Sequence, residues 1–484
     1  MTYSTLLSMG GWGVLLILVY WVVVYVLVVS DDKPPTTTLA WLAVLYAIPL
    51  IGVLFYFFFG RDWSRSRKFS FRADLERMAP FMDPIYARYR PLQVKLEARN
   101  EGHFENKIDQ AIRELNFSQP LPVTSFEDHP SGEAAFARLL TDLDAAKRFI
   151  HMQYFIWERD ELTAKIMEVL HRKLKEGVEV RVTYDWGGSI VYKKDELKAL
   201  AAAGGQVHAD VKGLTTINYR NHRKITVVDG DIGHTGGLNI GQEYIDGGKE
   251  YPAWRDTGIR LTGPAVAELQ KLFSIRWYAI TGEMLMDEKY LPSPVAALDT
   301  EDPLMVQVVA HSTDDPWSSS TRTHTIAIAA AEKSVRIQSP YFVPNESIYD
   351  AMLNAALAGV DVQFMMTGWP DHKSAFSAAK SYWLKYLRSG GRLFLYQKGF
   401  FHAKTIAVDS RVSAIGTMNM DLRSFTLQKE MMVWIYGEER ALELERIFED
   451  DLQECREVTL EEVEAFTFGQ RLAHSTNRLA AHLM

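Results

Sequence analysis

Two copies of a His-x-Lys-x4-Asp pattern have the clearest chemical potential in the sequence. Their members, in chain order, are His222, Lys224, Asp229, His402, Lys404 and Asp409. An imidazole can attack phosphorus or carry a proton, and a neighbouring lysine ammonium is a fixed cation. Two imidazoles and two ammonium groups around one phosphate would supply a nucleophile, a proton donor and stabilisation of negative charge. The pattern therefore predicts a single phosphoryl-transfer site built from both copies.

Each copy continues into the same downstream residues. A glycine follows the aspartate by seven positions and an asparagine follows three later, giving Gly236 with Asn239 and Gly416 with Asn419. A single His-x-Lys pair on a strand is usually an ordinary surface feature, but a second copy with the same spacing favours catalysis. The asparagines would add neutral donors for phosphate oxygens. The glycines are expected to allow a ligand to approach the backbone closely.

A β-strand followed by a tight turn would position these groups. His222 and Lys224 are two residues apart in a β-like run, so their side chains share one face. Asp229-Gly230 is a strong turn signal, which predicts a hairpin that returns Asn239 toward that face. Asp229 and Asp409 are counted with the catalytic motifs. Because they lie at the turn, with strand parity opposite to the histidines, they are expected to act as salt-bridge or turn-capping residues.

The two copies align once more beyond the asparagines. Residues 256–263 and 430–437 each begin with an acid, continue as an apolar strand and reach glycine seven positions later. The acids are Asp256 and Glu430. A carboxylate at this point could accept the second imidazole N–H of a catalytic histidine and fix its tautomer. The alternative is an ordinary acid at the end of a surface strand.

The motifs belong to a longer internal repeat. Similar strand-like segments occur at 149–156 and 337–343, and each is followed by a glycine turn and another buried strand, at 177–184 and 359–366. The order strand–helix–strand predicts an α/β fold of two homologous halves, each a mainly parallel sheet flanked by helices. We place the first half at 71–295 and the second at 296–484, with a helix from Leu460 to the C-terminus that is expected to pack or to touch a membrane surface.

The first seventy residues predict a membrane hairpin. Residues 9–29 and 39–59 are two uncharged apolar runs, each long enough to cross a hydrocarbon layer of ~30 Å. Pro49 predicts a kink in the second run. A polar link at 30–38 joins the runs, and a basic cluster follows, which would keep both ends cytoplasmic. The cluster comprises Arg61, Arg65, Arg67, Lys68 and Arg72. A cleaved signal peptide and a buried helical hairpin are the alternatives.

Composition narrows the remaining possibilities. The chain has 484 residues and a net charge of -8, which argues against a surface built mainly for nucleic acid. Its single cysteine, Cys455, cannot form an internal disulfide. No P-loop or dinucleotide fingerprint is present. Ordinary structural roles are expected for six other histidines: His171, His208, His234, His311, His324 and His372.

The paired motifs resemble the phospholipase D superfamily, and the arrangement along nearly the whole chain is similar to the bacterial cardiolipin synthase family. The resemblance rests on both motifs, the apolar hairpin, and flanking segments at 59–61, 154–156, 218–224, 236–244, 254–257, 339–344 and 419–424. It implies an enzyme of the bacterial cytoplasmic membrane, with its catalytic part on the cytoplasmic side. It also implies transfer of a phosphatidyl group between two phosphatidylglycerol molecules, giving cardiolipin and glycerol without a metal or another cofactor.

The resemblance further implies that His222 attacks phosphorus and His402 protonates the leaving glycerol, although the near-symmetry of the halves leaves the reverse assignment open. The chain departs from the usual pattern in having Thr417 where serine is common and Gln428 where asparagine is common. Hydrolysis of a phosphodiester is an alternative, because the same motifs can serve water. A lipid-binding protein without activity is a further alternative.

Overall fold

The computed structural model describes residues 3–30, 35–61, 71–189, 195–210, 218–293 and 302–479. The middle of the polar link at 30–38 and the basic residues Arg65, Arg67 and Lys68 lie outside these ranges. The chain forms two compact units, one of Met1–Lys68 with Gly213–Asn218 and one of Phe69–Lys212 with Tyr219–Met484. Each unit is described by itself.

The N-terminal unit is helical. Its elements are α1 (Tyr3–Tyr25), the π-helical turn η1 (Val26–Ser30), α2 (Pro35–Ala47), α3 (Pro49–Phe55) and η2 (Tyr56–Gly60). Pro49 separates α2 from α3 and occupies the first turn of α3, where its missing N–H costs no hydrogen bond. Leu27, Leu45 and Tyr56 form a small buried cluster. Within the ranges given above, none of the helices combines enough length with enough apolar character to span a membrane.

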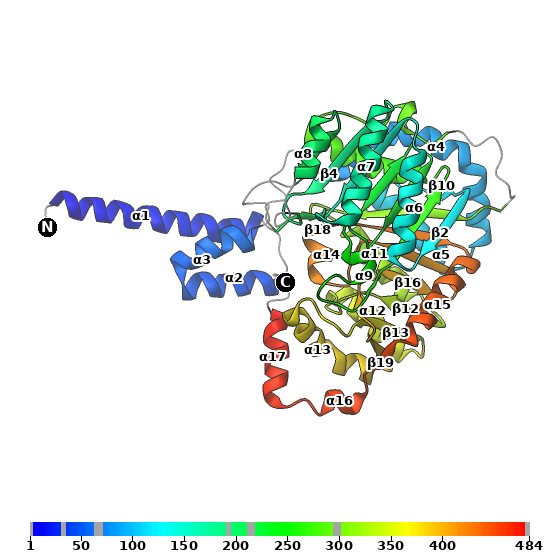
Figure 1. Cartoon of the computed structure of the whole chain (residues 1–484). Coiled ribbons are helices and arrows are strands. Elements are labelled where there is room, and N and C mark those ends of the chain that lie inside the picture. Colours follow the sequence, from blue (N-terminus) through cyan, green and yellow to red (C-terminus); the bar gives the residue numbers. More distant parts are fainter. Residues whose placement is uncertain are drawn as a thin grey trace. The chain divides into compact units, whose positions relative to one another are not determined.

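Among its described residues, the larger unit contains two large sheets, one for each half of the repeat, and a third sheet of two short strands. In Figure 1 the first half is drawn in cyan to green and the second mainly in yellow to red. The first sheet has the order β2-β10-β8-β7-β3-β4-β5 among the described strands. Their bounds are β2 (Ser125–His129), β3 (Phe149–Tyr154), β4 (Glu179–Asp185), β5 (Gln206–Asp210), β7 (Ile225–Val228), β8 (Ile232–Gly236) and β10 (Gly258–Thr262).

The second sheet has the order β1-β11-β18-β17-β16-β12-β13-β14-β19, with the short strand β6 (Arg220–Asn221) also paired to β18. The other bounds are β1 (Leu121–Pro122), β11 (Met305–His311), β12 (Ser334–Gln338), β13 (Asp361–Thr367), β14 (Arg392–Tyr396), β16 (Thr405–Val408), β17 (Val412–Gly416), β18 (Gln428–Tyr436) and β19 (Cys455–Glu457). The units β3-α7-β4 and β12-α12-β13 are the repeated core, through α7 (Glu161–Lys175) and α12 (Glu346–Leu357).

The prediction of mainly parallel sheets is wrong. In the first sheet only the β3–β4 and β4–β5 pairs are parallel, and the other pairs of the described strands are antiparallel. The reason is the motif hairpin: Asp229 and Gly230 reverse the chain with positive φ, so β7 and β8 must run antiparallel. Asp409 and Ser410 make the same turn in the second half. The sheets are mixed, with helices packed against them.

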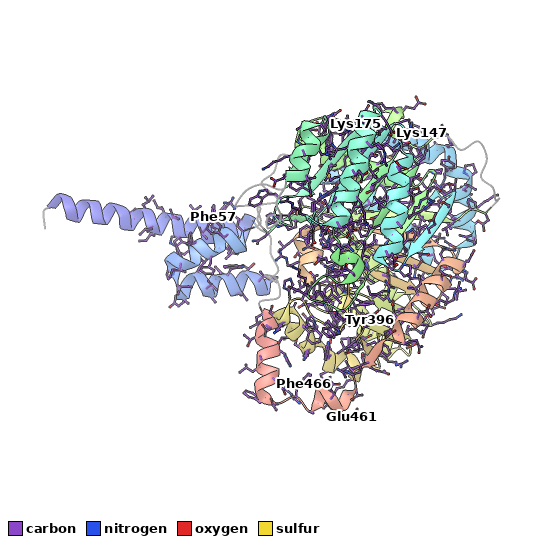
Figure 2. All side chains as sticks on the ribbon, in the orientation of Figure 1. Phe57, Lys147, Lys175, Tyr396, Glu461 and Phe466 are labelled. Carbon is purple, nitrogen blue, oxygen red and sulfur yellow. The ribbon has the colours of Figure 1, made fainter. Side chains whose placement is uncertain are left out.

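Helices divide the hydrophobic core into layers. α6 (Gly132–Ala145), α7 and α8 (Asp195–Ala202) bury their apolar residues against the first sheet. α11 (Ser319–Ala329), α12 and α13 (Lys373–Arg388) do the same for the second. A further core lies between the halves and joins α4 (Phe71–Arg99) and α10 (Val266–Thr281) to residues of both sheets. Side chains fill the space between these elements (Figure 2). The two halves therefore share a continuous interior.

Two segments differ from the expected outline. α5 (Phe104–Asn116) and β1 precede the first repeat in sequence, yet they pack against α11 and β11 of the second half. The C-terminal stretch is not one helix. It forms α16 (Leu460–Glu464) and α17 (Phe468–Leu479), and α17 lies along α13. The boundary between the halves near residue 295 stays a prediction. The second half is completed by α5 and β1, which come from before the first repeat in sequence.

Candidate active site

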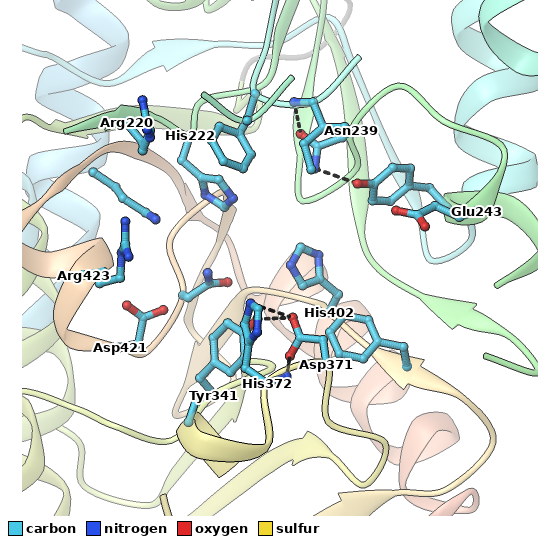
Figure 3. A pocket seen from close by; sticks show the side chains of 18 of the residues that line it. Arg220, His222, Asn239, Glu243, Tyr341, Asp371, His372, His402, Asp421 and Arg423 are labelled. Carbon is cyan, nitrogen blue, oxygen red and sulfur yellow. Dashed lines mark hydrogen bonds and ion pairs between the residues drawn. The ribbon is translucent and has the colours of Figure 1, made fainter. Parts of the chain in front are cut away.

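One cavity of about 440 Å³ is lined by residues from both halves of the repeat, including His222 and His402. The two imidazoles approach it from opposite sides (Figure 3). Asn239 and Asn419 also line the cavity. The sequence motifs, 180 residues apart, thus meet at one place.

Each histidine is bonded to a carboxylate of the opposite half. His222 Nδ1 lies 2.9 Å from Glu430 Oε1, and His402 Nδ1 lies 2.7 Å from Asp256 Oδ2. Both carboxylates are fully buried. An ionised carboxylate can only accept, so each Nδ1 carries the proton and donates it. This tautomer leaves the lone pair on Nε2, the nitrogen available to a substrate.

Short parallel strand pairs between the halves produce this crossed arrangement. β6 runs beside the start of β18, so His222 N donates to Lys429 O at 3.0 Å and Glu430 comes next along the strand. β15 (Phe400–Phe401) runs beside β9 (Trp254–Arg255), and His402 N donates to Arg255 O at 2.7 Å. His222 therefore follows β6, whose partner β18 contains Glu430, and His402 follows β15, whose partner β9 is followed directly by Asp256.

The motif lysines are almost completely buried next to the histidines. Lys224 Nζ donates to His222 O at 2.8 Å, and Lys404 Nζ donates to His402 O. Lys404 also lies 3.9 Å from Asp256 Oδ2. Burial lowers the pKa of Lys224 to about 7 and that of Lys404 to about 8. An anion that binds in the cavity would stabilise the protonated, ammonium form of both lysines.

The electrostatics of the two histidine–carboxylate pairs favour neutral imidazoles. Burial, with the nearby Lys404 ammonium, lowers the pKa of His402 to about 4, and burial also lowers the pKa of His222. The pKa values of Asp256 and Glu430 lie below the ordinary range despite burial, because cationic groups and hydrogen-bond donors surround them. A neutral imidazole with a free Nε2 is a competent nucleophile. A bound phosphate anion would offset the lysine charges and favour protonation of the other imidazole.

The two motif asparagines are held differently. Asn239 Oδ1 accepts from Ile156 N at 3.2 Å, and its Nδ2 donates to Tyr244 Oη at 3.1 Å. Asn419 Oδ1 is buried and has no hydrogen-bond partner among the described residues. Asn239 therefore fixes the loop after β3 as well as facing the cavity. The side chain of Asn419 is less constrained.

The motif aspartates lie at the hairpin turns and outside the lining of the cavity. Asp229 accepts from the backbone N–H groups of Lys147, Arg148 and Phe149, at 2.7–2.9 Å. Asp409 accepts at 2.8 Å from the backbone of 332–334. Each carboxylate thus ties a motif turn to the start of the neighbouring central strand. This geometry gives the aspartates a structural position and no contact with a reacting group.

The glycines after the motifs, Gly236 and Gly416, are not among the residues that line the cavity. A Cβ on Gly236 would collide with the backbone oxygen of Thr257, and one on Gly416 would collide with that of Met431. Glycine is therefore required at both positions by the close approach of the neighbouring chain segment, which carries Asp256 just before β10 in the first half and Glu430 near the start of β18 in the second.

Several residues that line the cavity lie outside the two motifs and were not predicted from them. Aromatic rings of Phe155, Trp254 and Phe400 lie within 4.9–5.6 Å of the catalytic imidazoles, centre to centre. His372, expected to be structural, lines the cavity beside Asp371. The other charged or polar lining residues are Arg220, Glu243, Glu250, Tyr251, Tyr341, Asp421, Arg423 and Gln428. Arg220, Asp421 and Arg423 lie within the sequence segments that carry the family resemblance, which is the one signal that marked them.

Comparison with known proteins agrees with this geometry. A family model described as "Cardiolipin synthase, PLD-like domain" matches residues 139–277 and 325–452. A cardiolipin synthase of Geobacillus kaustophilus is 35% identical over 92% of this chain and 89% of its own length. "Cardiolipin synthase 2" of Bacillus anthracis is 36% identical over 92% and 87%, and a cardiolipin synthase of Clostridium perfringens is 34% identical over 92% and 94%. The chain belongs to the cardiolipin synthase family.

Members of the cardiolipin synthase family are phosphatidyltransferases of the phospholipase D superfamily. The fold agrees with a solved phosphatidylserine synthase of Haemophilus influenzae, which has a TM-score of 0.61 and 15% identity over 78% of this chain and all of that one. A second family model, described as "Phospholipase_D-nuclease N-terminal", matches residues 14–61.

Within this family member the two orienting carboxylates have different supports. Glu430 accepts a hydrogen bond from the hydroxyl of Thr417, which itself accepts from Met431 N at 3.0 Å. The corresponding position in the first half is Gly237, where a Cβ would collide with the carboxylate of Asp256. Asp256 instead accepts from Thr257 N at 2.7 Å. The departure at Thr417 therefore keeps the hydroxyl that holds Glu430.

Proposed function

We propose that this protein synthesises cardiolipin by transferring the phosphatidyl group of one phosphatidylglycerol to a second, with release of glycerol. The observation that carries the proposal is the pair of imidazoles on one cavity, each bonded through Nδ1 to a buried carboxylate of the opposite half. Two Nε2 atoms directed at one space provide a nucleophile and an acid–base partner for the same phosphorus.

In the first step, Nε2 of His222 attacks the phosphorus of the donor lipid. The bond from phosphorus to the glycerol oxygen breaks as Nε2 of His402 gives that oxygen a proton. The product is a phosphatidyl group bound to His222, and glycerol leaves. Glu430 stabilises the cation that develops on the His222 ring, in the way a carboxylate does for a catalytic histidine.

In the second step, the terminal hydroxyl of the acceptor phosphatidylglycerol replaces glycerol. Nε2 of His402 now accepts the hydroxyl proton while the oxygen attacks phosphorus, and the bond to His222 breaks. Cardiolipin forms and both histidines return to their starting states. The Lys224 and Lys404 ammonium groups and the two asparagines would offset charge on the nonbridging oxygens in both steps.

The active site would work at the cytoplasmic face of a membrane. We propose that residues 9–29 and 39–59 form the membrane hairpin, with the catalytic unit following on the cytoplasmic side. The N-terminal family match over 14–61 supports a dedicated segment here. Its location can be tested by fractionating cells that produce the full chain and a chain beginning at Phe69. The proposal expects the full chain in the membrane fraction after a carbonate wash, and its release would contradict the hairpin.

The activity is tested with detergent-solubilised protein and phosphatidylglycerol labelled in the acyl chains. Cardiolipin and glycerol should form in equal amounts, without added metal. Phosphatidic acid as the sole labelled product would contradict transfer and establish a hydrolase, since water would then be the acceptor. A preparation with His222→Ala and His402→Ala together is the matched control for contaminating enzymes.

A further inference from the structure

Two arginines from opposite halves line the same side of the catalytic cavity. Arg220 belongs to β6 of the first half, and Arg423 belongs to α14 (Leu422–Thr426) of the second. The pairing of β6 with β18 brings them together, because Arg220 lies opposite Gln428 and its N–H donates to Leu427 O. Figure 3 shows both arginines on one side of His222, with Asn239 and Glu243 on the other side. The two arginines therefore lie across the cavity from Glu243, and the Asp421 carboxylate lies beside Arg423.

The guanidinium of Arg220 lacks a full set of acceptors. Its Nη1 is buried and has no hydrogen-bond partner among the described residues. The nearest carboxylate atom is Asp185 Oδ1, at 3.7 Å. That carboxylate already accepts from Gly188 N at 2.8 Å and from Asn221 N at 2.9 Å. A buried guanidinium N–H with no acceptor is unfavourable, and an anionic oxygen in the cavity would satisfy it.

The packing around Arg220 holds the guanidinium in this position. A Cβ on Gly187 would overlap the guanidinium group, so the glycine-containing turn after β4 lies directly against it. Burial lowers the pKa of Arg423, the Asp421 carboxylate opposes this shift, and Arg220 is close enough to add to it. Two like charges held beside one another repel, and an anion between them would offset this repulsion. Paired guanidiniums are suited to bind a phosphate group through several N–H donors.

The phosphate that reacts is already provided for by the histidines, lysines and asparagines of the two motifs. Under the proposed function, the acceptor lipid brings a second phosphodiester, joined to the attacking hydroxyl through one glycerol unit. We propose that Arg220 and Arg423 form a subsite for the phosphodiester of the acceptor phosphatidylglycerol. The subsite would hold the acceptor hydroxyl near the phosphohistidine and favour lipid over water. This inference rests on the proposed function and assigns its acceptor.

The test compares two acceptors that share one donor step. Full-length protein in detergent micelles is given phosphatidylglycerol, and cardiolipin formation is measured together with incorporation of labelled free glycerol into phosphatidylglycerol. Free glycerol has no phosphate, so its exchange does not use the subsite. For Arg220→Gln and Arg423→Gln, the ratio of cardiolipin formation to glycerol exchange should fall about tenfold or more, the effect of losing a charged hydrogen bond. Arg220→Lys keeps the positive charge but loses the paired N–H donors of the guanidinium, and it should lower the ratio less.

Arg392→Gln is the matched control, because Arg392 is an exposed arginine paired with Glu457 at 2.9 Å, and its ratio should equal that of the wild type. An unchanged ratio in both glutamine variants would overturn the subsite, as would equal losses of both reactions. Wild-type protein that exchanges glycerol but forms no cardiolipin would instead overturn the proposed function itself, and the acceptor subsite with it.

Discussion

The two halves of the catalytic unit are built alike but complete one another. Each contributes a histidine and an asparagine to the lining of the cavity and a buried lysine next to the histidine. Each also contributes the carboxylate that orients the histidine of the other half. A single half would leave its imidazole without an orienting acid and its acid without the imidazole donor. An unpaired buried carboxylate is strongly unfavourable. The crossing therefore joins catalysis to the docking of the halves.

The differences between the halves lie in how the acids are held. The first half uses the shorter Asp256, which fills the space beside Gly237 and is capped by the next backbone N–H. The second half uses the longer Glu430, which is held by the hydroxyl of Thr417. Asn239 is fixed by two hydrogen bonds, whereas Asn419 Oδ1 has none within the described part of the chain. Near-symmetric motifs thus have distinguishable surroundings, as two different roles in one reaction require.

Replacing either histidine should have the largest effect on the reaction. We expect His222→Ala and His402→Ala each to lower cardiolipin formation by more than ~10³-fold, because a nucleophile and an acid–base group are both needed. The measurement is the initial rate with labelled phosphatidylglycerol. His324→Ala, which removes a buried histidine outside the cavity, is a control for general loss of histidine packing. Substantial turnover in either catalytic variant would contradict the two-histidine site.

Removing the charge of an orienting acid should have the next largest effect. We expect Glu430→Gln and Asp256→Asn each to lower kcat by about 10²-fold or more, because the amide can stabilise the wrong tautomer and lacks the charge. The crossed pairing can be tested by nitrogen-15 NMR of the histidine rings, which reports the chemical shift of each Nδ1. Glu430→Gln should shift the Nδ1 signal of His222 more than that of His402, and Asp256→Asn should do the reverse. Pairing within each half would give the opposite pattern.

The support of Glu430 should have a moderate effect. Thr417→Val removes the hydroxyl donor from a buried carboxylate at almost constant volume, and we expect about a tenfold loss of kcat. Thr417→Ser keeps the hydroxyl and should retain most of the activity. Since the first half has Gly237 at the equivalent position, the comparison predicts that Asp256 does not depend on this hydroxyl. Equal activity of the valine and serine variants would contradict a role for the Thr417 hydroxyl in holding Glu430.

The lysines predict an alkaline limit to the reaction. The ammonium forms bind the phosphate, and they are lost as the pH rises through the lowered pKa values of about 7 for Lys224 and about 8 for Lys404. We therefore expect kcat/KM to begin to fall above about pH 7, as Lys224 loses its proton, and to fall more steeply above about pH 8, as Lys404 does. In Lys404→Arg the cation persists at higher pH, so the limit should move upward or lose steepness. A limit unchanged in the variants of both lysines would assign it to another group.

The motif aspartates should have the smallest effect on the chemical step. Asp229→Asn and Asp409→Asn each weaken a set of backbone hydrogen bonds at a turn. We expect stability to fall by about 1–3 kcal/mol while kcat of the folded enzyme stays within about threefold. Thermal unfolding and kcat measured on the same preparation separate these effects. Loss of kcat without loss of stability would give the aspartates a catalytic role.

Much of the site could be predicted from the sequence because its residues recur at fixed spacing. The repeat gave the two halves, the motif gave the histidines and lysines, and the alignment beyond Asn239 and Asn419 pointed to Asp256 and Glu430. The crossing could not be predicted, because spacing within one half does not say which imidazole a carboxylate meets. That is decided by the pairing of β6 with β18 and of β9 with β15. The sheets were misjudged because antiparallel pairs, formed by the motif hairpins and by strands distant in sequence, outnumber the parallel pairs that the helical crossovers make between the described strands.

The most direct test of the shared site is to trap the covalent intermediate. Phosphatidylglycerol labelled with phosphorus-32 is mixed with wild-type protein, His222→Ala and His402→Ala, and the reaction is quenched and digested for peptide mapping. We expect label on His222 in the wild type and none in His222→Ala. In His402→Ala, which lacks both the proton donor of the first step and the base of the second, label should form on His222 more slowly and then persist. Label on His402 alone would reverse the two roles. Label on neither histidine, with cardiolipin still formed, would contradict the covalent mechanism and the shared site.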